Sequence, residues 1–142
     1  MANNNSFVFR LRILHVDLTA EKTWTEIWDD PRKTKNFIGG VGFGAEILWR
    51  ELPRHVRSAD PENRLVFASG PLTGTGAPGS GLYCLTTIGP LGESLTSAQS
   101  NGNFGAYMRF AGYDVIVIQG AAASWRYLYI HDGKVSFGDA TP

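Results

Sequence analysis

Cysteine is almost absent from this sequence. Among its 142 residues, Cys84 alone carries a thiol. One thiol excludes a disulfide within the chain, and it excludes a chain that supplies all four thiolates of an iron–sulfur cluster or of a cysteine-rich zinc site. A free cysteine most often packs as a small apolar residue. We therefore predict that Cys84 is buried on a strand.

Net charge and long apolar runs are also absent. Lysine and arginine together number 13, as do aspartate and glutamate, so the formal net charge is zero. Without a basic run, the chain lacks the electrostatic signature of a protein that binds nucleic acid or an anionic membrane. No apolar run is long enough to span a bilayer, and the opening residues "MANNNS" lack the segments of a signal peptide. We expect a cytoplasmic protein with neither a nucleic-acid nor a membrane partner.

The hydrophobic pattern predicts mostly strands with a few short helices. Hydrophobic residues make up 43% of the chain, which is enough to form the core of a single domain over residues 1–142. Alternating or short apolar runs predict strands at 7–17, 23–28, 65–68, 82–89, 93–100 and 115–120, and a hairpin over 124–137 that turns at Asp132-Gly133. Helices are predicted at 31–38, capped by Asp30, at 42–53, and at 104–110, followed by Gly112. Because strands and helices do not alternate regularly, we expect an α+β fold.

The segment "GVGFGA" at residues 40–45 fits the dinucleotide-binding pattern G-x-G-x-x-G/A, and Asp60 lies about where that pattern places a ribose-binding acid. The context differs, since a predicted helix precedes the glycines and Asp60 falls in a polar loop. We instead favour a close-packed helix start, at which side chains would clash.

The titratable residues do not form a recognisable catalytic set. His15, His55 and His131 are scattered, and none has a second ligand at metal-binding spacing, so we expect surface or edge histidines. The acidic groups at 29–30 and 60–62 fall at turns or helix caps, where aspartate is common. We therefore predict no catalytic residue and no metal ligand in this chain.

Two glycine-rich stretches are the best candidates for a binding site. Residues 69–84, "SGPLTGTGAPGSGLYC", form either a slack surface loop or a tight loop whose backbone can approach a phosphate or a flat cofactor. Residues 98–105, "AQSNGNFG", lead into a helix whose first N–H groups suit an anion. The alternative for the second stretch is ordinary helix capping by Asn101. The residues alone leave both choices open.

Longer stretches are more specific. These are "FIGGVGFGAEILWRELP" at 37–53, "ENRLVFASGPLTGTGAP" at 62–78 and "FGAYMRFAGYDVIVIQG" at 104–120. In this order they resemble the N-terminal domain of the tungsten-containing aldehyde ferredoxin oxidoreductase family. The resemblance implies a β-rich shelf of two sheets, on which tungsten or molybdenum is held by two pyranopterins with Mg²⁺ bridging their phosphates. It further implies oxidation of aldehydes to carboxylic acids, with electrons passing through a 4Fe–4S cluster to ferredoxin.

The resemblance also implies which residues contact the cofactor. The family's arginine after G-P-L-T-G-T falls on Leu82, and its asparagine before the following helix falls on Gln99, with Ser100, Asn101 and Gly102 as that residue's neighbours. Leu82 lacks the guanidinium that would pair with a phosphate, whereas Gln99 keeps an amide on a side chain one methylene longer. We expect these five residues to bind the cofactor.

The family's cluster cysteines and substrate channel have no counterpart in residues 1–142. We therefore expect a truncated pterin-binding domain that is inactive as an isolated chain, with the iron–sulfur and substrate domains absent from it. The remaining domains or a complementary subunit would complete the enzyme. The alternatives are a non-catalytic cofactor carrier or interaction module, and a non-functional fragment of a broken reading frame.

Overall fold

The structure is a computed structural model, and it describes residues 10–142. The elements in chain order are β1 (Leu11–Asp17), β2 (Lys22–Trp28), α1 (Pro31–Phe37), α2 (Val41–Glu51), β3 (Arg64–Ser69), β4 (Tyr83–Gly89), β5 (Ser94–Ser100), α3 (Phe104–Phe110), β6 (Val115–Gln119), β7 (Arg126–His131) and β8 (Lys134–Asp139). The first residues of the strand predicted from Phe7 lie outside the described part of the chain.

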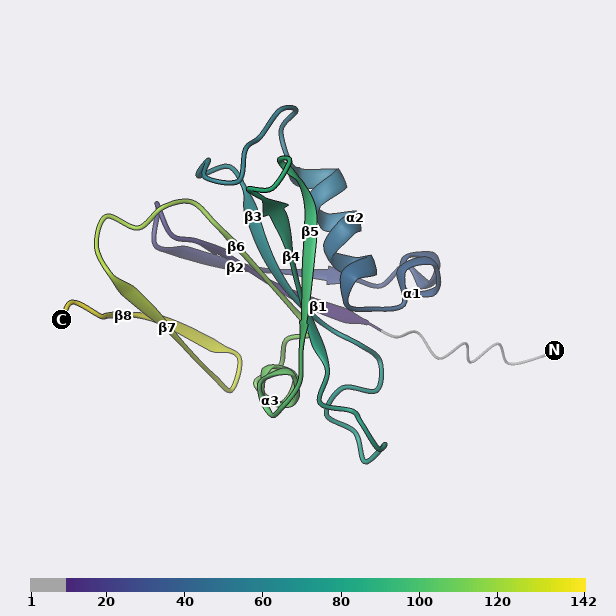
Figure 1. The fold of residues 1–142 in the computed structure, drawn as a ribbon. Helices are drawn as coiled ribbons and strands as arrows, with labels where there is room; N and C mark the ends of the chain where they lie inside the picture. Colours follow the sequence, from purple (N-terminus) through teal and green to yellow (C-terminus); the bar gives the residue numbers. More distant parts are fainter. Residues whose placement is uncertain (1–9) are drawn as a thin grey trace.

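Six strands form the larger sheet, in the order β2-β1-β6-β3-β4-β5 (Figure 1). β1 and β6 run parallel, with Ile13 opposite Val115, and the other neighbouring strands are antiparallel. β7 and β8 form a second, two-stranded sheet. The predicted α+β fold, with two sheets and short helices, is confirmed.

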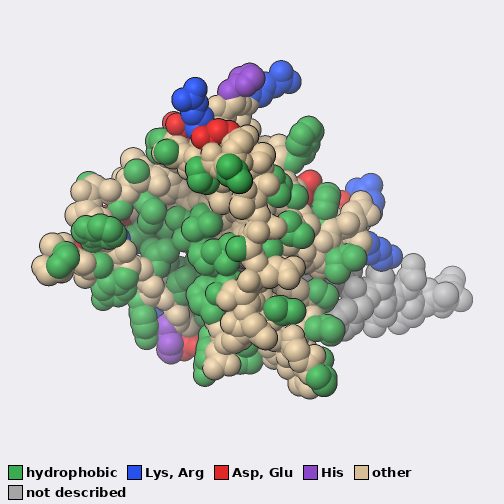
Figure 2. All heavy atoms as spheres, in the orientation of Figure 1, with side chains coloured by type: hydrophobic (Ala, Val, Ile, Leu, Met, Phe, Trp, Pro, Cys, Tyr) green, Lys and Arg blue, Asp and Glu red, His purple; other side chains and the backbone are tan. Residues whose placement is uncertain are grey.

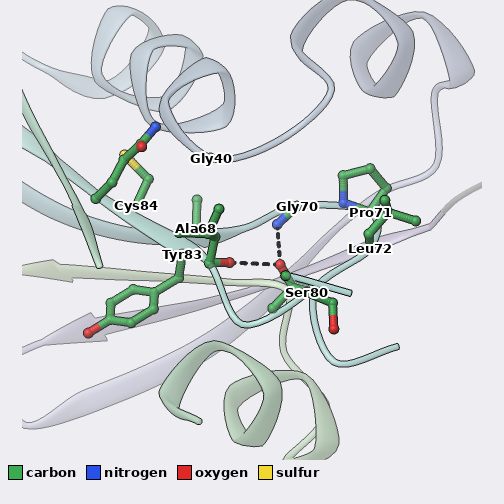
Figure 3. Close-up of a pocket in the computed structure, with 12 residues that line it drawn as sticks. Gly40, Ala68, Gly70, Pro71, Leu72, Ser80, Tyr83 and Cys84 are labelled. Carbon is green, nitrogen blue, oxygen red and sulfur yellow. Dashed lines mark hydrogen bonds between the residues drawn. The ribbon is translucent and has the colours of Figure 1, made fainter. Parts of the chain in front are cut away.

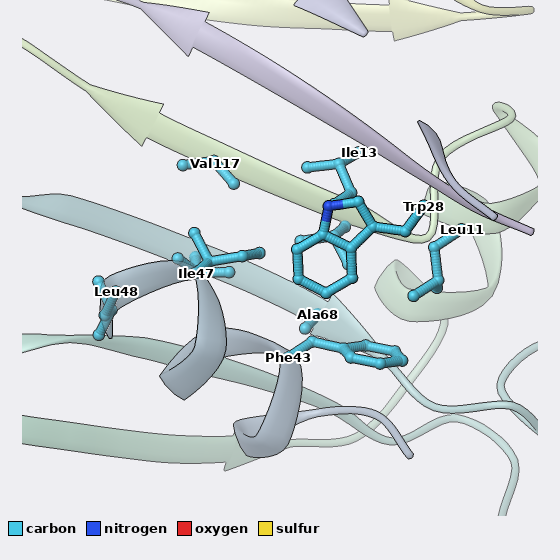
Figure 4. Packing of buried hydrophobic residues seen from close by; sticks show 10 residues of the cluster. Leu11, Ile13, Trp28, Phe43, Ile47, Leu48, Ala68 and Val117 are labelled. Carbon is cyan, nitrogen blue, oxygen red and sulfur yellow. The ribbon is translucent and has the colours of Figure 1, made fainter. Parts of the chain in front are cut away.

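Helix α2 covers one face of the larger sheet. Its residues Phe43 and Ile47 pack against alternate, fully buried residues of β1, β3 and β6 (Figure 4). Trp28 at the end of β2 closes this cluster, with its ring perpendicular to that of Phe43 and the ring centroids 6.2 Å apart. Burial of one such large side chain contributes about 1.5–3 kcal/mol, so this cluster fixes α2 firmly on the sheet.

The opposite face of the sheet packs against α3 and the β7–β8 hairpin. Figure 2 shows the hydrophobic side chains that gather between the hairpin and the body of the molecule. The Tyr113 hydroxyl donates to the Gly133 carbonyl at 2.8 Å, and the Gly133 N–H donates to the Ala111 carbonyl at 2.9 Å. These two hydrogen bonds join the tip of the hairpin to the end of α3.

The predicted cap at Asp30, the predicted turn at Asp132-Gly133 and the predicted glycine after α3 are confirmed. The Asp30 carboxylate accepts the Arg32 N–H at 2.9 Å and so caps α1. Asp132 and Gly133 both have positive φ, at 48° and 73°, and they join β7 to β8 as a two-residue turn. Gly112, with φ of 98°, follows the end of α3.

The glycines at the start of α2 serve close packing, as predicted. A side chain at Gly42 would collide with the Phe37 carbonyl, and a Cβ at Gly44 would lie 2.5 Å from the Cβ of Thr86. The preceding element is α1 rather than a strand, and the Asp60 carboxylate accepts the Arg57 N–H within a loop. The dinucleotide pattern therefore lacks its structural context.

Cys84 is buried in β4, as predicted. None of the helices within residues 10–142 combines the length and the apolarity needed to cross a membrane.

Candidate cofactor site

A hollow of about 290 Å³ opens between the start of α2 and the loop that follows β3 (Figure 3). Four segments form its wall: the α1–α2 turn at Gly40, the end of β3, the loop from Gly70 to Leu82 with the start of β4, and β5 at Gln99. None of the twelve lining residues carries a charge. The hollow therefore suits a flat, largely neutral group rather than an isolated anion.

The loop from Gly70 to Leu82 is tightly hydrogen-bonded rather than slack. The Thr73 hydroxyl accepts the Gly70 N–H at 2.9 Å and donates to the Leu82 carbonyl at 2.8 Å (Figure 3). The Gly74 N–H donates to the Ser80 carbonyl at 2.9 Å, with Gly74 at a φ of 75°. These bonds close the loop on itself, and Gly74 is needed because other residues rarely adopt that conformation.

Arg109 of α3 also holds this loop in place. One terminal nitrogen of its guanidinium donates to the Pro71 carbonyl at 3.1 Å and to the Thr73 carbonyl at 2.7 Å. No local sequence pattern marks this residue as part of a site. The available signal was a basic side chain inside the specific stretch 104–120, but its partners are remote in sequence and only the fold brings them together.

Leu82 and Gln99 line the same hollow. Gln99 pairs with Cys84 across β4 and β5, and side chains of directly paired residues lie on the same face of a sheet. Leu82 is two residues before Cys84 and therefore lies on that face too, 51% exposed.

Ser100, Asn101 and Gly102 do not line the hollow. Ser100 pairs with Tyr83, one position along each strand from the Cys84–Gln99 pair, so its side chain lies on the other face of the sheet. Asn101 and Gly102 contact Gly81 instead, where an added Cβ would lie 2.6 Å from the Asn101 side-chain oxygen.

The structure contradicts capping of α3 by Asn101, one of the two alternatives for residues 98–105. The residue at the cap position is Asn103, and its side chain makes no capping hydrogen bond. The Asn101 side-chain oxygen accepts the Gly102 N–H at 2.7 Å, and Gly102 adopts a φ of 113°. The turn at Gly102 thus places Asn101 before the helix rather than at its first turn.

The prediction of a surface or edge histidine is wrong for His15. Its side chain is 3% exposed, stacks on Trp24 with ring centroids 4.9 Å apart, and forms a hydrogen bond to Glu26 at 3.1 Å. Glu51 of α2 lies 4.0 Å from the other ring nitrogen. No sequence pattern marks this cluster, because only the pairing of β1 with β2 and the position of α2 bring its members together.

The cluster of His15, Glu26 and Glu51 has donor atoms within 4.8 Å of one another, close enough for a metal ion. Arg50, however, donates to both Glu26 oxygens at 2.8 and 2.9 Å, and the Arg64 Nε lies 3.5 Å from Glu51. Two guanidinium groups thus already neutralise the two carboxylates. We interpret the cluster as an ion-pair network that attaches α2 to β1 and β2.

A second concavity, of about 400 Å³, lies between α3 and the β7–β8 hairpin. Phe67, Met108 and Ile130 are typical of its apolar lining. It lacks the converging polar groups that mark a specific ligand site, so the hollow at Gly40 and Gln99 is the better candidate.

Fold and hollow together define an α+β domain with a glycine-rich concave surface. Residues 13–142 match the family described as aldehyde ferredoxin oxidoreductase, N-terminal domain. The chain belongs to this family, as the resemblance in the sequence implied.

Individual relatives agree with this assignment. The chain is 43% identical over 134 residues to a tungsten-containing aldehyde ferredoxin oxidoreductase of Pyrococcus abyssi, and 36% identical over 138 residues to the WOR-like subunit of an aliphatic sulfonate oxidoreductase of Pyrococcus furiosus. These matches cover 92% and 95% of the chain, but only 21% and 22% of the relatives. The chain thus spans about a fifth of the length of oxidoreductases to which it is similar.

A solved structure is similar as well. It is the active-site complex BamBC of benzoyl coenzyme A reductase with 1,5-dienoyl-CoA, which superposes with a TM-score of 0.86 at 36% identity. The superposition covers 91% of this chain and 20% of that one.

Proposed function

We propose that this chain is the N-terminal cofactor-binding domain of an oxidoreductase that carries tungsten or molybdenum on two pyranopterins. The full enzyme would oxidise aldehydes to carboxylic acids in the cytoplasm and pass electrons to ferredoxin. The observation that carries the proposal is the uncharged hollow between Gly40, the Gly70–Leu82 loop and Gln99. Membership of the family and its tungsten-containing relatives support it.

The residues of the hollow fit the ring system of a pterin better than its phosphate. Gly40 and Gly70 leave room for a flat ring, and Ala68 and Leu82 offer apolar contacts. The Gln99 amide can both donate and accept at the polar edge of such a ring. At about 290 Å³ the hollow is at the lower end of ligand pockets, which typically enclose ~300–1,000 Å³, so it would hold only part of the cofactor.

The phosphates would need a positive charge from elsewhere, because Leu82 supplies none. The resemblance assigns part of that role to Mg²⁺. Ser100, Asn101 and Gly102 would contact the cofactor only where it extends beyond the hollow past Gly81. When bound, the metal would supply the redox chemistry, while this chain's residues bind and orient the group and exclude water from one side of it.

The remaining parts of the enzyme would come from further domains or from a complementary subunit. The chain covers 21% of its tungsten-containing relatives, and its single cysteine cannot hold a 4Fe–4S cluster. The cluster, the substrate channel and the ferredoxin-binding surface would therefore lie outside residues 1–142.

The test is cofactor retention by the purified full chain. We expect mass spectrometry to detect tungsten or molybdenum in a stoichiometric amount relative to the protein. We expect acid oxidation to release a stoichiometric amount of fluorescent pterin. Gln99→Ala should lower the pterin content, because it removes the amide from the hollow. Unchanged content would show that Gln99 does not contact the cofactor.

Leu82→Arg tests the other predicted contact in the opposite direction. A guanidinium at the edge of the hollow should pair with a cofactor phosphate and slow the loss of pterin during dialysis. The matched control is Leu91→Arg, which adds the same charge at a residue 90% exposed in the β4–β5 turn. Equal retention by both variants would show that a side chain at position 82 does not reach a cofactor phosphate.

A second candidate function is that of a non-catalytic cofactor carrier. The uncharged hollow favours it, since weak attachment of the phosphates would suit release to another protein. A carrier should transfer pterin to a cofactor-free enzyme within minutes, whereas a catalytic domain should retain it. A protein that folds but contains neither metal nor pterin would support the third alternative, a non-functional fragment.

A further inference from the structure

The Arg109 side chain lies at the centre of a hydrogen-bond network beneath the hollow. It is 22% exposed, and its Nη1 group donates to the carbonyls of Pro71 and Thr73, with the Gly70 carbonyl at 3.5 Å. Its Nε group donates to the Asp114 carboxylate at 3.1 Å. A single charged group thus gathers backbone oxygens from the loop that forms one wall of the hollow.

Asp114 connects this network to the rest of the fold. Its other carboxylate oxygen accepts the Arg12 N–H of β1 at 2.9 Å. Its backbone carbonyl accepts both the N–H and the hydroxyl of Ser69, at 3.0 and 2.9 Å, where the loop leaves β3. The start of the loop and the side chain that holds its middle are therefore attached to the same residue.

The orientation of the carbonyls has a consequence for the opposite side of the loop. In a trans peptide the C=O and the following N–H point in opposite directions, so a Pro71 carbonyl turned toward Arg109 turns the Leu72 N–H away from it. Leu72 lines the hollow, and its N–H donates to no acceptor among the hydrogen bonds of residues 10–142. A positive charge on the carbonyl side also polarises the peptide group and strengthens its N–H as a donor.

We propose that Arg109 is a positioning residue for the cofactor. By gathering the carbonyls on one side of the loop, it holds the wall of the hollow in its binding shape and presents the Leu72 N–H to the bound group. The inference rests on the proposed function, since it concerns the same hollow. Arg109 itself is separated from the hollow by the loop and would act through it.

The experiment uses the full chain with Arg109→Met and Arg109→Lys. The matched control is Arg126→Met, which removes a guanidinium of similar exposure, 29%, that bonds to Glu21 away from the hollow. For Arg109→Met we expect amide hydrogen exchange in residues 73–75 to be about tenfold faster, because the turn loses its attachment, while exchange in β6 stays unchanged. Pterin retention should fall in parallel.

Arg109→Lys separates positioning from general stability. A lysine keeps the charge beside Asp114, but it lacks the planar array of donors that bonds several oxygens at once. We therefore expect the midpoint of thermal unfolding to recover in Arg109→Lys while fast exchange of residues 73–75 and weak pterin retention persist. Arg126→Met should leave the exchange of residues 73–75 and the pterin retention at the wild-type level.

Three results would each be decisive. Unchanged exchange of residues 73–75 in Arg109→Met would overturn the inference, as would faster exchange with unchanged pterin retention. Wild-type protein that retains no pterin would instead refute the proposed function. Exchange alone would then decide whether Arg109 orders the loop.

Discussion

Gly44 provides the sharpest test of how α2 is held beside the hollow. The Cβ of an alanine at this position would lie 2.5 Å from the Cβ and 3.0 Å from the Cγ2 of Thr86, which is fully buried in β4. Carbon atoms in good contact are ~3.5–4.0 Å apart, so α2 or β4 must move by about 1 Å. Thr86 cannot turn aside, because it is branched at Cβ and fixed in the middle of a sheet.

The size of the effect follows from two opposing contributions. Overpacking a well-packed site costs about 1–3 kcal/mol, whereas replacing glycine by alanine within a helix gains about 1 kcal/mol. A Cβ–Cβ approach of 2.5 Å is severe and places the overpacking cost in the upper part of its range, at about 2–3 kcal/mol, so we expect Gly44→Ala to lower the free energy of unfolding by about 1–2 kcal/mol. The measurement is urea unfolding monitored by tryptophan fluorescence. The midpoint urea concentrations of the two proteins are compared with one shared m-value, the slope of the unfolding free energy against urea concentration.

The control is Gly76→Ala in the loop beside the hollow. Gly76 has no atom within 4 Å of the added Cβ and no positive φ, so the free energy of unfolding should stay within about 0.5 kcal/mol of the wild-type value. A Gly44→Ala protein as stable as wild type, or more stable, would refute the close approach of α2 to β4. In a Thr86→Ala background the cost of Gly44→Ala should shrink, because two of the three clashing atoms are gone.

Two further predictions concern the ion-pair cluster and the hairpin. Burial would raise the pKa of Glu26, but hydrogen bonds from Arg50 and Trp28 outweigh that effect and lower the pKa below 4.5. The contribution of Glu26 to the free energy of unfolding should therefore be complete above pH 4.5. It should be lost as the pH falls through the lowered pKa. Glu26→Gln should flatten this part of the stability curve in acid titrations, and an unaltered curve would contradict its role. Tyr113→Phe removes the hydroxyl that donates to the Gly133 carbonyl, so it should lower the free energy of unfolding by about 1 kcal/mol in the same urea assay. NMR should show that the Asp132-Gly133 turn is intact in this variant. No loss of stability would contradict the attachment of the hairpin to α3.

The sequence predicted most of the elements because the signals for them are local. Alternation of apolar residues along β1 and β4, the cap at Asp30 and the turn at Asp132-Gly133 each depend on a few neighbouring residues. The close packing at Gly44 was also predictable in kind, since glycines at a helix start commonly mark a close approach. Its partner, Thr86, became known only from the sheet.

The candidate site could be predicted only in part. The glycine-rich loop and Gln99 were found from the sequence, and the structure places both at one hollow. Ser100 was assigned to the same group because it is adjacent in sequence, yet neighbouring residues of a strand lie on opposite faces. Arg109 was missed because its partners are carbonyl groups, which carry no mark in the sequence.

By itself, then, the sequence determined the α+β class and the family, and its single cysteine excluded a four-thiolate iron–sulfur cluster held by this chain alone. These conclusions depend on composition, local periodicity and continuous motifs. Only the tertiary structure decided that His15 is buried between Glu26 and Glu51, that Leu82 and Gln99 lie together, and that Arg109 supports the Gly70–Leu82 loop. The physical reason is that these contacts join residues remote in the chain. Strand register and helix packing set their distances, and no short segment encodes either one.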